Sequence, residues 1–288
     1  MRRAVVKVPE ITALFWITKI LTTGMGESTS DFMNQGLGPA IAVPLMLLGL
    51  AAALVLQFKA RRYVASVYWL VVVMVSVFGT SAADALHVGF GIPYVVSTAF
   101  YAIVLAIVFA AWHRSEETLS IHSIYTPRRE TFYWATVLAT FALGTAAGDM
   151  TATSLHLGYL ASGFLFAGLI AIPALAWWRF GLNEILAFWL AYILTRPLGA
   201  SFADWMAVPR SKGGLGWGTG PVSLGLALAI VGFVAYLTVS RADVRGEQGA
   251  HVGPARHPPH EHAVRPMHGE PHLLPEPHVR PTLGFEPE

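Results

Sequence analysis

The sequence repeats one pattern four times: WITKILTTGMGESTSD (16–31), WLVVVMVSVFGTSAAD (69–84), WATVLATFALGTAAGD (134–149) and WLAYILTRPLGASFAD (189–204). In every copy a glycine stands ten residues after the tryptophan and an aspartate fifteen residues after it, without a gap. The copies start 53, 65 and 55 residues apart, which fits one pair of helices per copy. The chain is therefore predicted to contain four tandem two-helix repeats.

The composition indicates a polytopic membrane protein. Of 288 residues, 55% are hydrophobic and 12% are charged, whereas a soluble domain carries about 25% charged residues. The apolar residues form blocks of about 20, the length that crosses a bilayer as a helix. We expect an all-α fold with eight transmembrane helices, near residues 10–32, 39–58, 63–83, 93–112, 132–150, 157–178, 184–205 and 220–239.

The basic residues predict the orientation. Twelve Lys and Arg residues lie at the N-terminus, in alternate loops and after the last span, and only Arg210 and Lys212 lie on the other side. Because Lys and Arg near span ends stay in the cytoplasm, both termini are predicted to be cytoplasmic. Each repeat has two spans, so the four copies enter the membrane in the same direction. Since Glu10 and Lys19 interrupt the first apolar stretch, we expect it to be a permanent span and not a cleaved signal.

Two parts of the chain are expected. Residues 1–245 form the transmembrane domain, with repeats at about 8–60, 61–115, 126–180 and 181–240. The segment 246–288 is expected to be a disordered cytoplasmic tail, because its last 38 residues contain seven His and nine Pro. These histidines could bind metal weakly, or the segment could be an ordinary polar linker.

The repeated small and aromatic residues are expected to have architectural roles. Small residues at i and i+4 let helix backbones approach closely in lipid. This interpretation applies to the repeat glycines Gly26, Gly79, Gly144 and Gly199, which should draw the neighbouring aspartates together. The repeat tryptophans are interpreted as interfacial anchors or packing residues: Trp16, Trp69, Trp134 and Trp189.

A polar stripe on the first helix of each repeat is the candidate site. Ionisable residues inside a span are functional candidates because they are costly in lipid. The acidic set comprises Glu27, Asp31, Asp84, Asp149 and Asp204. Lys19 and Arg196 are the only basic residues inside the predicted spans, so convergence of all seven gives five negative and two positive charges, a net of −3. Thr80 and Thr145 lie on the same stripe and support the set.

Such a cluster would bind protons or a cation. Carboxylate, hydroxyl and carbonyl oxygens suit Mg, Ca and Mn, and an imidazole from His87 would shift the preference toward Mn or Zn. The alternative is that the aspartates face interfacial water or bind loop amides at the outer helix ends.

The pattern resembles a family of bacterial membrane proteins that consist of four tandem repeats of unknown function. The resemblance covers about residues 7–240, including KVPE at the start and GESTSDF in the first copy. It implies eight spans and an inner-membrane location, and it implies no established chemistry.

These observations favour a transporter of a divalent metal cation, with the metal as substrate and no known cofactor. The alternatives are a non-transporting membrane sensor or scaffold, or a proton-coupled carrier of a small organic solute. Enzyme motifs are absent, so we expect no enzymatic activity. The lipid bilayer is the expected partner, with a metal ion or proton and without nucleic acid. The sequence leaves substrate, direction, coupling ion and oligomeric state open.

Overall fold

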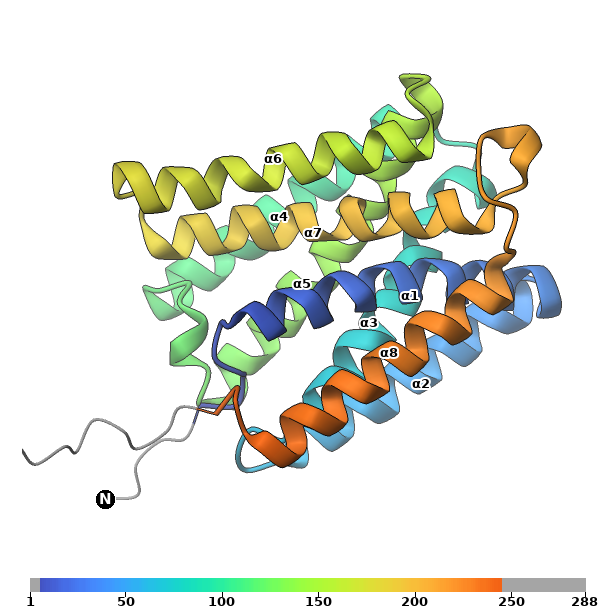
Figure 1. Cartoon of the computed structure of the whole chain (residues 1–288). Helices are drawn as coiled ribbons and strands as arrows, with labels where there is room; N and C mark the ends of the chain where they lie inside the picture. Colours follow the sequence, from blue (N-terminus) through green and yellow to red (C-terminus); the bar gives the residue numbers. More distant parts are fainter. Residues whose placement is uncertain (1–5, 245–288) are drawn as a thin grey trace, which may run out of the picture. The chain divides into compact units, whose positions relative to one another are not determined.

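The computed structural model describes residues 6–244, and Figure 1 shows them as a bundle of long helices. The described residues contain no strand, and the prediction of an all-α fold with eight long helices is confirmed. The helices are α1 Ala13–Leu37, α2 Pro39–Lys59, α3 Ala65–Asp84, α4 Tyr94–Glu116, α5 Pro127–Asp149, α6 Gly158–Phe180, α7 Glu184–Ala207 and α8 Thr219–Ser240. The segment 246–288, with its predicted disorder and histidines, lies outside the described residues.

Polar side chains mark the starts of three odd-numbered helices. The Thr12 hydroxyl accepts a hydrogen bond from the Phe15 amide at the start of α1. Thr126 does the same for α5, and the Asn183 carboxamide accepts two amide hydrogen bonds at the start of α7. These caps satisfy amides that have no partner within the helix.

The odd-numbered helices form the inner ring of the bundle. Helix α1 packs on α3 and α7, and α5 packs on the same two helices, which closes the ring. Each even-numbered helix packs most closely on the next odd-numbered one, and α8 closes the cycle on α1 (Figure 1). The four repeats therefore have a cyclic arrangement. The end of the ring near the repeat tryptophans is called the Trp end below, and the opposite end the Asp end.

Burial separates the two sets of helices. In α3 and α7, 61% of the most apolar window is buried, against 17–22% in α2, α4, α6 and α8. These six helices are long and apolar enough to cross a membrane. Helices α1 and α5 are not among the six. Helix α1 bears many polar side chains, which are buried between its neighbours. Exposed apolar side chains on the even helices, such as Leu48, Phe164 and Val231, are typical of a multi-pass membrane protein.

The repeat glycines lie where neighbouring ring helices touch. A Cβ atom added to each glycine would collide with the residue seven positions after the tryptophan of the next repeat. The four contacts join Gly26 to Ser76, Gly79 to Phe141, Gly144 to Arg196 and Gly199 to Thr23. The fourth contact returns to the first repeat, so the same close approach recurs around the whole ring.

Candidate functional site

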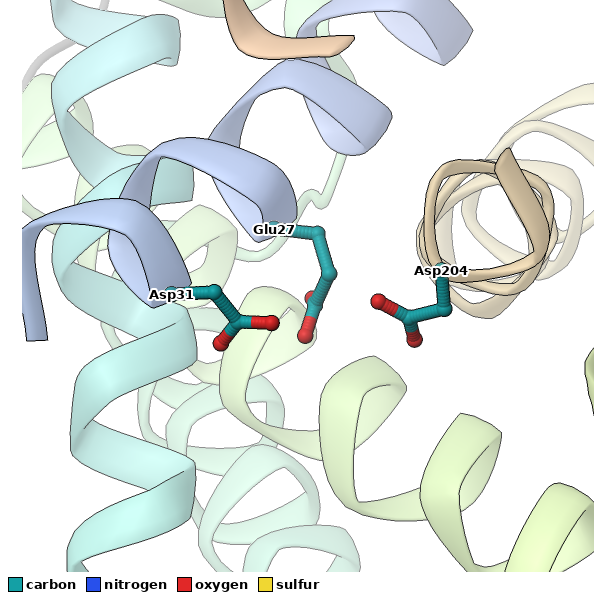
Figure 2. Close-up of side chains that lie close together, drawn as sticks. All are labelled: Glu27, Asp31 and Asp204. Carbon is teal, nitrogen blue, oxygen red and sulfur yellow. The ribbon is translucent and has the colours of Figure 1, made fainter. Parts of the chain in front are cut away.

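Three carboxylates from two ring helices meet near the Asp end. Glu27 and Asp31 lie one turn apart on α1, and Asp204 comes from α7. Figure 2 shows the three side chains pointing toward one another across the space between the two helices. One oxygen from each carboxylate lies within 4.8 Å of the others. The structure thus brings together residues that are up to 177 positions apart in the sequence.

Two of these carboxylates have no hydrogen-bond donor within residues 6–244. Glu27 and Asp204 are 4% and 8% exposed, and Asp31 is half-buried. Among the described residues, no donor forms a hydrogen bond with the carboxylate of Asp31 or Asp204, while Glu27 has partners. Buried carboxylates at this spacing repel one another unless a cation or protons offset their charge. The arrangement is therefore suited to binding a positively charged species.

Arg196 of α7 supplies the partner of Glu27. Its guanidinium is fully buried, and Nη2 lies 2.5 Å from Glu27 Oε2. The same nitrogen donates to the hydroxyls of Thr145, at 2.6 Å, and Thr80. Nη1 donates to the carbonyl oxygen of Thr23 at 3.1 Å. The predicted supporting residues Arg196, Thr80 and Thr145 thus lie in one network with Glu27.

Asp84 and Asp149 occupy a different setting from Asp31 and Asp204. Each is the last residue of its α-helix, and a five-residue π-helical turn follows directly, Ala85–Gly89 after α3 and Met150–Ser154 after α5. π-Helical turns are rare and frequently lie at functional sites. These two aspartates are not in the group of three carboxylates. The Asp residues of the second and third repeats therefore lie outside the cluster.

A cavity of about 550 Å³ connects the first two repeats at the Asp end. Its lining includes Asp31 and Asp84, together with the polar side chains of Asn34 and Ser81. The Asn34 amide donates to the Ser81 hydroxyl at 3.1 Å. The sequence interpretation missed both residues. Asn34 has no counterpart in the other copies, whereas Ser81 stands twelve residues after its tryptophan, a position that is also serine in the first and fourth copies (Ser28 and Ser201). Asp31 therefore lies in the wall of a cavity at the Asp end.

His87 is engaged locally and does not join the three carboxylates. Its Nδ1 lies 2.7 Å from the carbonyl oxygen of Ile92, and its ring stacks on Tyr94 with 3.5 Å between ring centres. The spacing of three residues from Asp84 placed the imidazole near that carboxylate along the helix. The π-helical turn that contains His87 changes this register.

Lys19 lies between aromatic rings and not beside an acid. Its side chain is 1% exposed, and Nζ is 4.0 Å from the ring centre of Phe141 and 4.2 Å from that of Tyr192. Within the described residues, Nζ has no hydrogen-bond acceptor. The rings supply a cation–π attraction, which replaces part of the lost hydration. Of the two basic residues within the spans, only Arg196 pairs with the acidic cluster.

Aromatic side chains fill the ring at the Trp end. Trp69, Trp134 and Trp189 are buried and Trp16 is partly buried. The residue before each repeat tryptophan is also a buried aromatic: Phe15, Tyr68, Tyr133 and Phe188. The Tyr68 and Tyr133 hydroxyls lie 2.5 Å apart. This aromatic pair in every copy was a second signal of the repeat, and the sequence interpretation did not use it.

A buried ion pair also lies at the Trp end. Lys7 Nζ is 2.7 Å from Glu130 Oε2, and the Gln57 amide donates to Glu130 Oε1 at 2.9 Å. Glu130 is fully buried. Glu130 lies in the first turn of α5, and both of its partners come from distant parts of the sequence. Lys7 and Gln57 are 123 and 73 residues away from Glu130, so no local sequence pattern predicts these contacts.

Comparison with known proteins identifies the family of the chain. A family model described as Repeat of Unknown Function (DUF347) matches residues 14–63, 67–118, 132–182 and 187–243. The chain belongs to this family. The four matches confirm the predicted likeness to a tandem-repeat family of unknown function. No curated protein and no solved structure matches the chain.

Proposed function

We propose that this protein is a multi-pass membrane transporter that binds a divalent metal cation, its substrate, at Glu27, Asp31 and Asp204. The observation that carries the proposal is the convergence of three carboxylates from α1 and α7. Their oxygens lie within 4.8 Å of one another. Two oxygens that bind one Ca²⁺ at about 2.3–2.6 Å are at most about 5 Å apart, so one ion fits the spacing.

The distribution of acidic and aromatic residues along the ring supports entry of the metal ion from the Asp end. The cavity lined by Asp31 and Asp84 supplies an approach to the cluster. At the Trp end, buried aromatic rings and the Lys7–Glu130 ion pair close the path. A carrier needs a second conformation in which this closure opens and the Asp end closes. Protons that replace the metal on the carboxylates would supply the coupling.

Flux in proteoliposomes tests transport. Vesicles that contain the purified protein and a metal-sensitive dye should fill with Mn²⁺ faster than empty vesicles, and Asp31→Asn or Asp204→Asn should abolish the difference. Glu184→Gln is the matched control, because this acid is exposed at the start of α7, far along the helix from Asp204. Equal flux in wild type and both Asn variants would eliminate the proposed site.

The same assay separates a transporter from a sensor that works through its tail. Deletion of residues 246–288 should leave the flux intact, because the three carboxylates lie in α1 and α7. A protein that binds Mn²⁺ without any flux would fit the sensor class instead.

The proposal also assigns the membrane orientation. All eight long helices cross the bacterial inner membrane, and both termini and the Trp end face the cytoplasm, as the distribution of Lys and Arg favours. The chain contains no cysteine, so a single introduced cysteine labels without background. In intact spheroplasts, a membrane-impermeant maleimide should label Lys212→Cys and leave Arg61→Cys unlabelled. The reverse pattern would invert the topology.

A further inference from the structure

The Arg196 side chain binds residues that occupy the same position in three different repeats. The residues eleven positions after the four tryptophans are Glu27, Thr80, Thr145 and Ala200. The first three all accept a hydrogen bond from Nη2 of Arg196. The fourth is alanine, in the same repeat as Arg196. A single guanidinium therefore binds the equivalent residues of the other three repeats.

The position of Arg196 is held from several sides. Its side chain is fully buried, and Gly144 of α5 approaches its Cβ and Cγ so closely that a Cβ on Gly144 would collide with them. The Thr23 carbonyl oxygen accepts from Nη1. Because backbone, hydroxyl and carboxylate groups all fix the guanidinium, its charge stays beside Glu27.

This fixed charge changes the balance of the three-carboxylate cluster. Ionised Glu27, Asp31 and Asp204 carry −3 together, and the 2.5 Å ion pair with Arg196 offsets one of these charges. The remainder, −2, equals the charge that a divalent cation neutralises. A low-dielectric interior penalises net charge strongly, so the cluster with Arg196 matches a divalent ion better than a trivalent one.

Asp204 gives a second, separate observation that points to a bound cation. It is 8% exposed, and no described residue donates a hydrogen bond to its carboxylate, whereas Figure 2 shows that carboxylate aimed at Glu27 and Asp31. A carboxylate so buried needs a positive or protic partner. Arg196 already serves Glu27, which leaves Asp204 for the incoming ion.

We infer that Arg196 is a specificity-determining residue that lowers the negative charge of the cluster from −3 to −2 and so shifts its preference from trivalent toward divalent cations. This inference rests on the proposed function. It goes beyond that function because it names the residue that determines the charge class of the substrate. The value of −2 counts only the three carboxylates that can contact the ion and the guanidinium paired with one of them. Asp84, Asp149 and Lys19 lie outside this group and are the same in every variant below, so they do not affect the differences between variants.

The test measures the ratio of the affinities for Tb³⁺ and Ca²⁺ on the full-length protein in detergent. Tb³⁺ binding is followed by luminescence sensitised by tryptophan, and Ca²⁺ binding by competition. Arg196→Gln should raise the preference for Tb³⁺ over Ca²⁺ by about 10- to 100-fold, because one positive charge near the ion is lost. Arg196→Lys keeps the charge and should stay within about threefold of wild type.

Two further variants keep the inference testable if Arg196→Gln fails to fold. Glu27→Gln leaves Arg196 in place and changes the cluster to −1, so the preference should shift toward Ca²⁺ by a similar factor. The double variant E27Q/R196Q returns the cluster to −2 and should regain the wild-type ratio. A set of variants that all show the wild-type ratio overturns the inference while the proposed site stands. A wild-type protein that binds neither ion overturns the proposed function, and the inference with it.

Discussion

The two ends of the ring use buried acids in opposite ways. At the Trp end, both carboxylate oxygens of Glu130 accept hydrogen bonds, one from Lys7 and one from Gln57. At the Asp end, Asp204 is nearly as buried, and no described donor reaches its carboxylate. The partners of a buried acid offset the cost of removing its charge from water. A buried acid without them costs stability, and such a cost is retained where a ligand is bound.

The largest expected effect comes from breaking the Trp end. Glu130→Ala leaves the Lys7 ammonium buried without its counter-charge, and we expect a loss of about 3–5 kcal/mol in the free energy of unfolding. Unfolding in detergent by SDS titration, followed by tryptophan fluorescence, measures it. The double variant K7M/E130L should recover much of the loss because both charges leave together. A Glu130→Ala variant as stable as wild type would remove the contrast between the two ends.

Asp204→Asn should behave in the opposite way at the Asp end. The substitution removes an unpartnered negative charge, so the free energy of unfolding should stay within about 1 kcal/mol of wild type or rise. The affinity for Mn²⁺ should fall by about 100-fold, or about 2.7 kcal/mol, because one of three carboxylate ligands is lost. Isothermal titration and unfolding are measured on the same preparation. Loss of stability together with unchanged affinity would assign Asp204 to the fold.

A wedge between α1 and α7 tests whether the Asp end depends on their close approach. A Cβ on Gly199 would lie 2.8 Å from the Ile20 carbonyl oxygen and would also collide with the Thr23 side chain. Gly199→Ala should therefore cost about 1–2 kcal/mol and weaken Mn²⁺ binding several-fold by moving Asp204 away from Asp31. Gly225→Ala in α8 is the matched control, because nothing lies within 4 Å of its added Cβ. Equal Mn²⁺ affinity in both variants would argue against the wedge.

The fold was largely predictable because a pattern that occurs in four copies of one chain rarely arises by chance. The tryptophan, glycine and aspartate positions occur in all four copies, so the eight helices followed from the sequence. The cluster was only partly predictable. Its acids stand at repeated positions, but the repeat does not show that Glu27, Asp31 and Asp204 meet while Asp84 and Asp149 stay outside the group, nor that π-helical turns follow α3 and α5. The sequence pattern alone also contains no sign of the distant pairing between Lys7 and Glu130.

Lys19 lies between the two ends and should be a net cost to stability. Its ammonium is fully buried against Phe141 and Tyr192 and lacks an acceptor among the described residues. Lys19→Met keeps the length of the side chain and removes the charge, so we expect a gain of about 1 kcal/mol in the free energy of unfolding. The Ca²⁺ affinity is measured alongside. A destabilised Lys19→Met protein would show that the aromatic contacts outweigh the desolvation.

The smallest effect concerns Asp243, which combines features of both kinds of acid. Tyr63 donates to its Oδ2, while Oδ1 is buried without a partner among the described residues. Burial raises the pKa of the Asp243 carboxyl, and the Tyr63 hydrogen bond offsets only part of that rise. A raised pKa means that the folded state binds the proton more tightly than the unfolded state does. The contribution of Asp243 to stability is therefore greatest below the ordinary pKa of an aspartate and is lost as the pH rises through the raised value.

Asp243→Asn should flatten this part of the stability profile, measured by unfolding between about pH 4 and pH 7. A profile that keeps its slope in the variant would assign the pH dependence to other groups.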